Sequence, residues 1–86
     1  MPSLERLLKA LANRRRLGIV NYLKNHREAT VGELADAIKL SLKATSKHLT
    51  VLSAADIIDR EQRSLLVYYR LADDLSRAAR TILTLL

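Results

Sequence analysis

Two helix-start signals, one short helix apart, constrain this chain more than any other feature. Thr30-Val31-Gly32-Glu33 has the spacing of a capping box, in which the Thr hydroxyl and the Glu carboxylate each accept a hydrogen bond from the other residue's backbone N–H. Ser41 offers a second N-cap, and the intervening Lys39-Leu40 leaves room only for a tight turn. We therefore predict helices over about 31–38 and 42–54, joined as a helix-turn-helix.

The residues before this pair predict two further helices. Pro2-Ser3 followed by Glu5 is typical of a helix start, and Asn13 offers the N-cap of the next helix, which ends near Asn25-His26. The first helix, about 3–12, carries leucines at the spacing of one helical face: Leu4, Leu7, Leu8 and Leu11.

The period changes after Asp56. Ile57-Ile58, the charged "DREQRS" and the alternating "LLVYYRL" predict two strands of a β-hairpin. Because the turn lacks Gly, we expect a loop of four or more residues rather than a tight two-residue turn. Asp73-Asp74 then places negative charge at the start of a last helix, about 73–86, where the helix dipole favours it.

The fold class predicted from these elements is mainly α with a small β-hairpin. Their order, α-α-α-α-β-β-α, is that of a winged helix-turn-helix with an extra helix at each end. A length of 86 residues allows one small domain, so residues 1–86 are expected to form a single unit.

Charge and composition narrow the possible functions. The net charge of +6 is concentrated in residues 1–30 and favours a polyanionic partner. The absence of Cys excludes disulfides and thiolate metal sites, and two His without clustered carboxylates leave little from which to build an active site, so we predict that the chain is not an enzyme. No apolar run approaches the ~20 residues of a membrane span, and the N-terminus lacks a signal-peptide pattern. We expect a cytoplasmic protein with no membrane partner.

The helix predicted over 42–54 has two unlike faces. Thr45, Leu49 and Leu52 fall together on one side, with His48 at its edge. The opposite side carries short hydroxyls, which allow close approach of a backbone, beside two bases that can reach phosphates or guanine: Lys43, Ser46, Lys47 and Thr50. This face suits a helix that lies in the major groove of DNA, whereas the alternative is ordinary solvent exposure.

Three more residues of this helix enter the predicted DNA-binding set. Leu42, in the first turn, is placed to contact a thymine methyl. Ser41 caps the helix, and a capped N-terminus can also hold a phosphate. His48 is expected to pack at the core edge or to bond a phosphate.

The hairpin carries two further candidates for DNA contact. Arg60 and Arg63 flank its tip and are expected to reach a phosphate or the adjacent minor groove, with local ion pairing to Asp59 and Glu61 as the alternative. Tyr68 and Tyr69 point to opposite faces of their strand, so one is expected to pack and the other to meet solvent or a phosphate.

Arg14, Arg15 and Arg16 stand together at a predicted helix N-terminus, where positive charge opposes the helix dipole by up to roughly 0.3–1 kcal/mol each. An anionic group, either an acidic side chain or nucleic acid, is therefore expected beside them.

Several stretches of the chain resemble the ArsR-type winged-helix transcription regulators. The resemblance runs from about Leu8 to Leu71 and is carried best by "ELADAIKLS", "SKHLTVL" and "VYYRL". It implies a dimeric repressor that binds operator DNA through the helix over 42–54, and it implies a structural ion pair for Arg16.

The chain departs from the metal-sensing members of that family. Where they often carry a Cys-x-Cys-type box, this sequence has "TVGEL", and Leu75 stands where a second site would need His. Two isolated His cannot supply a first-row metal site without acidic partners. We expect neither a metal nor another cofactor.

The terminal helices carry apolar stripes that a winged core does not need to bury. We expect them to form the interface of a homodimer, the alternative being a compact monomer. The predicted interface residues are Leu4, Leu7, Leu8, Leu11, Leu75, Ala79, Ile82, Leu83 and Leu86. The function predicted from sequence is a sequence-specific, double-stranded-DNA-binding repressor, and the alternative is a winged-helix module that binds protein or RNA.

Overall fold

The helices of the protein are capped at their N-termini by short polar side chains. The computed structural model describes residues 3–86. Its elements are α1 (Leu4–Leu11), α2 (Arg14–Asn25), β1 (Ala29–Thr30), α3 (Val31–Ile38), α4 (Leu42–Ala54), β2 (Ile58–Arg63), β3 (Leu66–Leu71) and α5 (Arg77–Leu83). The predicted caps Ser3, Asn13, Thr30 and Ser41 are confirmed, because each side chain accepts a backbone N–H of the first turn. The capping box is complete, with 3.2 Å from Glu33 N to Thr30 Oγ1 and 2.8 Å from Thr30 N to Glu33 Oε1.

The last helix begins later than the sequence predicts. Ser76 is its N-cap and accepts the N–H of Ala79 at 3.1 Å. Asp73 and Asp74 lie in an exposed turn before it, so the prediction that the helix starts at Asp73 is wrong. A hydroxyl that accepts a specific N–H defines the helix start here, whereas the two carboxylates offer only a favourable charge.

The turn between α3 and α4 depends on a left-handed residue. Lys39 has a φ of 56°, and its N–H bonds back to the carbonyls of Ala35 and Asp36. Leu40 N also bonds to Ala35 O at 3.0 Å, which closes the end of α3. The chain thereby reverses within three residues and delivers Ser41 as the cap of α4, as the helix-turn-helix prediction requires.

Three strands, rather than the predicted two, form the sheet. Its order is β1-β3-β2 and both pairings are antiparallel, with Thr30 opposite Tyr68. Arg63 pairs directly with Leu66, so only Ser64 and Leu65 form the hairpin turn. The prediction of a loop of four or more residues is wrong, because Ser64 takes the left-handed conformation (φ 59°) that was expected to need Gly.

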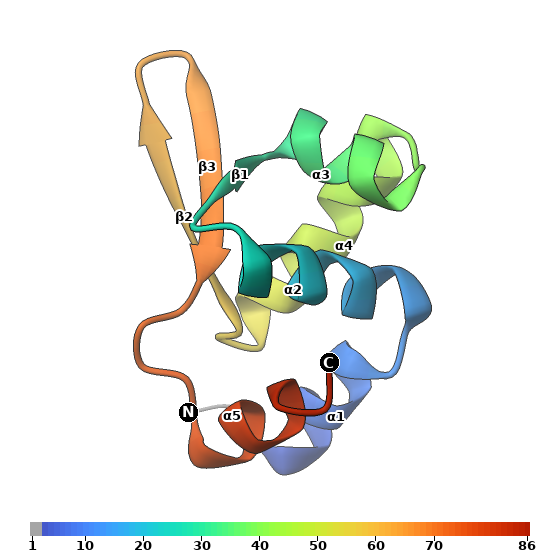
Figure 1. The fold of residues 1–86 in the computed structure, drawn as a ribbon, viewed down its shortest axis with the longest axis vertical. Helices are drawn as coiled ribbons and strands as arrows, with labels where there is room; N and C mark the ends of the chain where they lie inside the picture. Colours follow the sequence, from blue (N-terminus) through green and yellow to red (C-terminus); the bar gives the residue numbers. More distant parts are fainter. Residues whose placement is uncertain (1–2) are drawn as a thin grey trace.

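The helices and the base of the sheet enclose a single apolar core. Figure 1 shows α1 and α5 at one end of the molecule and the hairpin tip at the other. The core includes fully buried residues from α2, α3, α4 and the bend just before β2: Ile19, Val20, Leu34, Leu49, Leu52 and Ile57. None of the helices in residues 3–86 has the length and apolar character needed to cross a membrane.

The terminal helices bury much of their apolar stripes in this same core. Leu7, Leu11, Ala79 and Leu83 are at most 6% exposed, and Leu75 and Ile82 are half-buried against the cluster. The premise that these stripes lack partners within the chain is therefore wrong for these six residues. Leu4 and Leu8 remain 60% and 48% exposed, and Leu86 is also exposed. An interface between two copies stays a prediction, and it now depends on these three.

Candidate nucleic-acid interface

The outer face of α4 is exposed and basic. Lys43, Ser46, Lys47 and Thr50 are all exposed, whereas Thr45, Leu49 and Leu52 on the inner face are buried, so the predicted division of the helix is confirmed. No acidic residue occurs anywhere in the segment Leu42–Ala54. The side chains of the two lysines have no hydrogen bond or ion pair with any residue of 3–86, which leaves both ammonium groups available to an anion.

Three hydroxyl groups at the start of α4 and along it differ in their hydrogen bonding. Ser41 Oγ accepts the N–H of Ala44 at 3.1 Å, as an N-cap does. Thr50 Oγ1 donates to the carbonyl of Ser46 at 3.1 Å, within the helix. Thr45 Oγ1 is fully buried and has no hydrogen-bond partner. Beside the cap, Leu42 is 57% exposed, which agrees with its predicted outward position.

The ring of His48 lies between α4 and α2 rather than on the outer face of α4. Its Nδ1 is 3.2 Å from Arg16 Nη1, and because a guanidinium only donates, Nδ1 is the acceptor and the imidazole is neutral. Burial, followed by the positive charges of Arg16 and Arg15, lowers the pKa of His48 below its ordinary value. The expected packing at the core edge is confirmed. In this tautomer the ring carries its N–H on Nε2, and a bond from that group to a phosphate stays a prediction.

Two of the three arginines at the start of α2 bind the carbonyl ends of other helices. Arg16 Nε donates to Ala10 O at 2.5 Å and Nη2 donates to Lys9 O at 3.1 Å, at the C-terminus of α1. Arg15 Nη1 donates to Ile38 O and, at 3.5 Å, to Lys39 O, at the C-terminus of α3. The negative ends of two helix dipoles therefore offset the charges of Arg15 and Arg16. No acidic side chain of residues 3–86 pairs with the three arginines, so the expectation of an acidic partner is wrong, and a contact with nucleic acid stays a prediction. Arg16 is structural, as the resemblance implies, but its partners are carbonyls and a histidine instead of a carboxylate.

The two arginines of the hairpin point to opposite faces of the sheet. Arg60 pairs with Tyr69, whose ring packs against the core, so Arg60 lies on the side of the sheet that faces the helices. Arg63 lies on the outer side, where its guanidinium stands 3.7 Å over the ring of Tyr68. The two tyrosines therefore take opposite faces, as predicted.

Arg63 is held by an ion pair that the sequence did not indicate. Its Nη2 lies 2.6 Å from Glu28 Oε1, beyond β3, while Glu61 pairs with Arg70 at 3.1 Å. The hydrogen bond from Arg63 lowers the pKa of Glu28, and the same bond raises the pKa of Arg63. Pairing with Asp59 or Glu61, the alternative suggested by proximity in sequence, is therefore wrong for Arg63. The short β1 follows Glu28 and brings it to this position, and no pattern in the sequence indicates β1.

The side chains of residues 3–86 form no cluster of three or more His, Cys, Asp or Glu that can hold a metal ion. Both histidines have other contacts. His26 stacks on Tyr22, with ring centroids 3.9 Å apart and an interplanar angle of 11°, and its Nδ1 lies 2.9 Å from the Tyr22 carbonyl. His48 contacts Arg16, as described above.

The comparisons with known proteins agree on one family. The family model described as "Bacterial regulatory protein, arsR family" matches residues 13–60, which contain α2, α3, α4 and the start of β2. The "Transcriptional activator HlyU" of Vibrio cholerae is 39% identical over 66 residues, covering 77% of this chain and 60% of that protein. The "HTH-type transcriptional repressor SmtB" of Mycobacterium tuberculosis is 40% identical over 67 residues, covering 78% of this chain and 49% of that protein. The chain thus spans about half to three fifths of the length of these curated relatives.

Solved structures confirm the predicted fold. The homodimeric winged helix-turn-helix DNA-binding domain (fragment 1-100) of Mb0332 from Mycobacterium bovis, described as a possible ArsR-family transcriptional regulator, superposes with a TM-score of 0.82. It is 30% identical in sequence, and the match covers 95% of this chain and 76% of that one. The structure of reduced HlyU from Vibrio cholerae gives a TM-score of 0.81 at 34% identity, over 94% of this chain and 81% of that one.

Proposed function

The chain belongs to the arsR family of bacterial regulatory proteins, and from this premise we propose that it is a homodimeric, sequence-specific DNA-binding protein that represses transcription. It acts by occupying an operator in the cytoplasm and not by catalysis. The observation that carries the proposal is the outer face of α4, where two unpaired lysines and two small hydroxyl residues stand on a helix without any acidic side chain. Such a face matches the acceptors and methyl groups on the base edges of the major groove.

Each residue of the interface has a proposed role. Lys43, Ser46, Lys47 and Thr50 read bases or adjacent phosphates, as the N-terminal part of a recognition helix does. Leu42 contacts a thymine methyl, and the first turn capped by Ser41 lies against a phosphate. Arg60 contacts a phosphate of the DNA backbone from the side of the hairpin that faces the helices. Arg63 fixes the shape of the hairpin through Glu28, so its contribution to DNA binding is indirect.

Two copies of α4 are needed for a tight complex. The end of the molecule formed by α1, α5 and the C-terminus lies far from the hairpin tip (Figure 1). The exposed leucines of α1 and the C-terminal residues offer a surface on which a second copy packs about a two-fold axis. Two recognition helices about 34 Å apart then reach half-sites one helical turn apart on one face of the duplex.

A selection on random duplexes, followed by affinity measurement at several salt concentrations, tests the proposal. We expect a palindromic site, and a slope of log K against log salt of roughly −5 to −7 if about six to eight phosphates are neutralised. Lys47→Glu should abolish specific binding while the far-UV circular dichroism is unchanged. Arg77→Glu, which makes the same charge change on α5, is the matched control and should bind within about threefold of the original chain. Failure to select any site, or tolerance of Lys47→Glu, would instead favour a winged helix that binds protein or RNA.

A further inference from the structure

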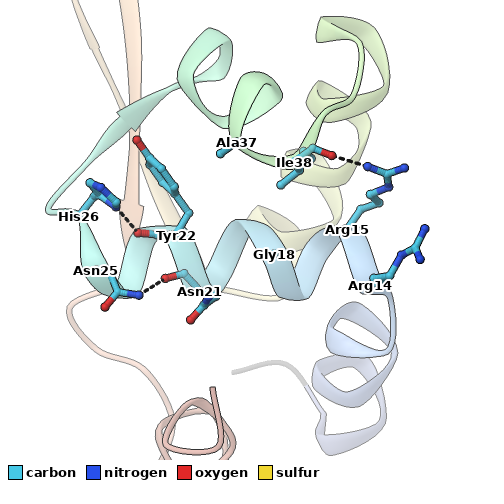
Figure 2. Close-up of a pocket in the computed structure, with 9 residues that line it drawn as sticks. All are labelled: Arg14, Arg15, Gly18, Asn21, Tyr22, Asn25, His26, Ala37 and Ile38. Atoms are coloured by element: carbon cyan, nitrogen blue, oxygen red, sulfur yellow. Dashed lines mark hydrogen bonds between the residues drawn. The ribbon is translucent and has the colours of Figure 1, made fainter.

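A groove between α2 and α3 lies outside the proposed DNA interface. Figure 2 shows the residues that line it. Its volume of about 470 Å³ is within the range of small-molecule sites. Arg14 and Arg15 stand at one end, and Asn21, Tyr22, Asn25 and His26 follow along the exposed side of α2. The α3 side is formed by Ala37 and Ile38.

The groove is positively charged without internal compensation. Its lining holds two guanidinium groups and no carboxylate. Arg14 is exposed and has no hydrogen bond or ion pair within residues 3–86, and the first turn of α2 has no acidic residue. A second hollow, at the base of the hairpin, differs in this respect, because there three arginines face three carboxylates. The α2–α3 groove is therefore matched to an anionic group, which a guanidinium binds in a bidentate manner.

The rest of the lining suits an organic molecule larger than an inorganic ion. The stacked rings of Tyr22 and His26 give the groove a flat aromatic wall. The side-chain amides of Asn21 and Asn25 lie beside it and offer both donors and acceptors.

The same groove adjoins the turn that sets the start of α4. Arg15 donates to Ile38 O and Lys39 O, and Lys39 is the left-handed residue of the helix-turn-helix. An oxyanion beside Arg14 competes with these two carbonyls for the Arg15 guanidinium, because a charged acceptor forms the stronger bond. Loss of the Arg15 bonds detaches the end of α3 from α2, while the backbone bonds of Lys39 and Leu40 still close the helix, and the helix-turn-helix can then shift relative to α2.

We propose that the α2–α3 groove is an effector site for a small aromatic acid, a carboxylate or a phosphate monoester, and that binding there lowers the affinity for DNA. The coupling to DNA rests on the proposed function, whereas binding of the acid itself does not.

Direct titration tests the site without DNA. The isotopically labelled chain is titrated with benzoate and with phenyl phosphate, and in parallel with inorganic phosphate, benzyl alcohol and benzylamine, at constant ionic strength. We expect saturable amide shifts at Gly18, Asn21, Asn25 and Ile38 with the two aromatic acids, and no saturation with the alcohol or the amine. Arg14→Ala should weaken binding at least fivefold, whereas Arg77→Ala should not change it. Shifts that spread over the whole surface, that do not saturate, or that persist unchanged in Arg14→Ala would overturn the site. Equal binding of inorganic phosphate would overturn the aromatic specificity.

A second measurement tests the coupling. The affinity for the selected duplex is determined with and without saturating phenyl phosphate or benzoate, and we expect a decrease of at least fivefold that is absent in Arg14→Ala. An unchanged affinity in the presence of a bound acid would overturn the effector role. If the chain selects no duplex at all, the proposed function fails, while the titration still decides whether the groove binds an acid.

Discussion

Arg16 Nε donates to the carbonyl oxygen of Ala10 at 2.5 Å, and this bond attaches the start of α2 to the end of α1. The arrangement recurs along α2. Arg15 binds the last carbonyls of α3, and Lys24 Nζ lies 2.9 Å from both Leu83 O and Leu86 O, after the last turn of α5. Three cations of one helix thus satisfy carbonyls at the C-termini of three others. Leu83 O also accepts a hydrogen bond from Leu86 N at 3.2 Å, whereas the other carbonyls have no partner inside their own helices. The cations of α2 therefore supply a shared set of caps that holds the terminal helices and the helix-turn-helix together.

Removal of the Arg16 guanidinium should destabilise the fold more than its partly exposed position suggests. Arg16→Ala leaves the carbonyls of Lys9 and Ala10 and the imidazole of His48 without their donor. Hydrogen bonds to charged groups contribute about 1.5–3 kcal/mol, so we expect a loss of about 2–3 kcal/mol in the free energy of unfolding, measured by urea denaturation. Arg14→Ala is the control, because that side chain has no partner within residues 3–86, and it should stay within about 0.5 kcal/mol. Equal stabilities for the two variants would contradict the capping role.

The buried hydroxyl of Thr45 should cost stability. Its Oγ1 is fully buried without a partner, while its methyl group packs in the core. Thr45→Val keeps the branched shape and removes the unsatisfied group, whose burial costs about 1–3 kcal/mol. We expect an increase of about 1 kcal/mol in the free energy of unfolding and a Tm about 4–8 °C higher by calorimetry. The exposed Thr50 of the same helix provides the control, since Thr50→Val should move Tm little. A lower Tm for Thr45→Val would show that the hydroxyl makes a bond in solution.

The helical part of the fold could be predicted because its determinants are local. A capping hydroxyl and the apolar period lie within a few residues of each other, so Thr30, Glu33 and Ser41 indicate α3 and α4 without reference to the rest of the chain. The outer face of α4 could be predicted from the same period. The strand β1 could not, because two residues carry no periodicity and are ordered only by pairing with β3.

The partners of Arg15 and Arg63 could not be predicted from the sequence for a related reason. Arg15 reaches α3 and Arg63 reaches Glu28 across separations that only the folded chain closes. Sequence proximity suggested Asp59 or Glu61 for Arg63, and an acidic side chain or nucleic acid was expected beside Arg15. Backbone carbonyls at helix ends, which Arg15 binds, carry no sequence signature. The burial of Leu7 and Ala79 within one chain is a similar case, since an apolar stripe does not reveal whether its partner is the same molecule or a second copy.

Acidification should destabilise the protein through His48. Burial and the neighbouring arginines lower the pKa of His48, so between its ordinary value of about 6.5 and the lower folded value the unfolded chain binds more protons than the folded chain. The stabilisation is fully present above pH 6.5 and is lost as the pH falls through this window. We expect urea midpoints to decrease from pH 7.5 to pH 5, and the decrease to become smaller in His48→Gln. His26→Gln, which leaves the Arg16–His48 contact intact, should keep the decrease of the original chain. An identical pH response in all three proteins would contradict the assignment.

Dimer formation should depend on the leucines that the core leaves exposed. Leu8 is 48% exposed on α1, whereas Ile82 is half-buried against the chain's own core, so only a change at Leu8 separates association from folding. Leu8→Glu places a charge in each half of a two-fold interface, and burial of a leucine contributes about 1.5–3 kcal/mol, so we expect the dimer dissociation constant to rise at least about tenfold. Sedimentation velocity over a range of protein concentrations measures the change. Leu65→Glu is the matched control, because Leu65 is 94% exposed at the hairpin turn, and it should leave the dimer intact. If Leu8→Glu remains as dimeric as Leu65→Glu, the two copies do not associate through α1, and the two-fold arrangement of recognition helices must be built on another surface.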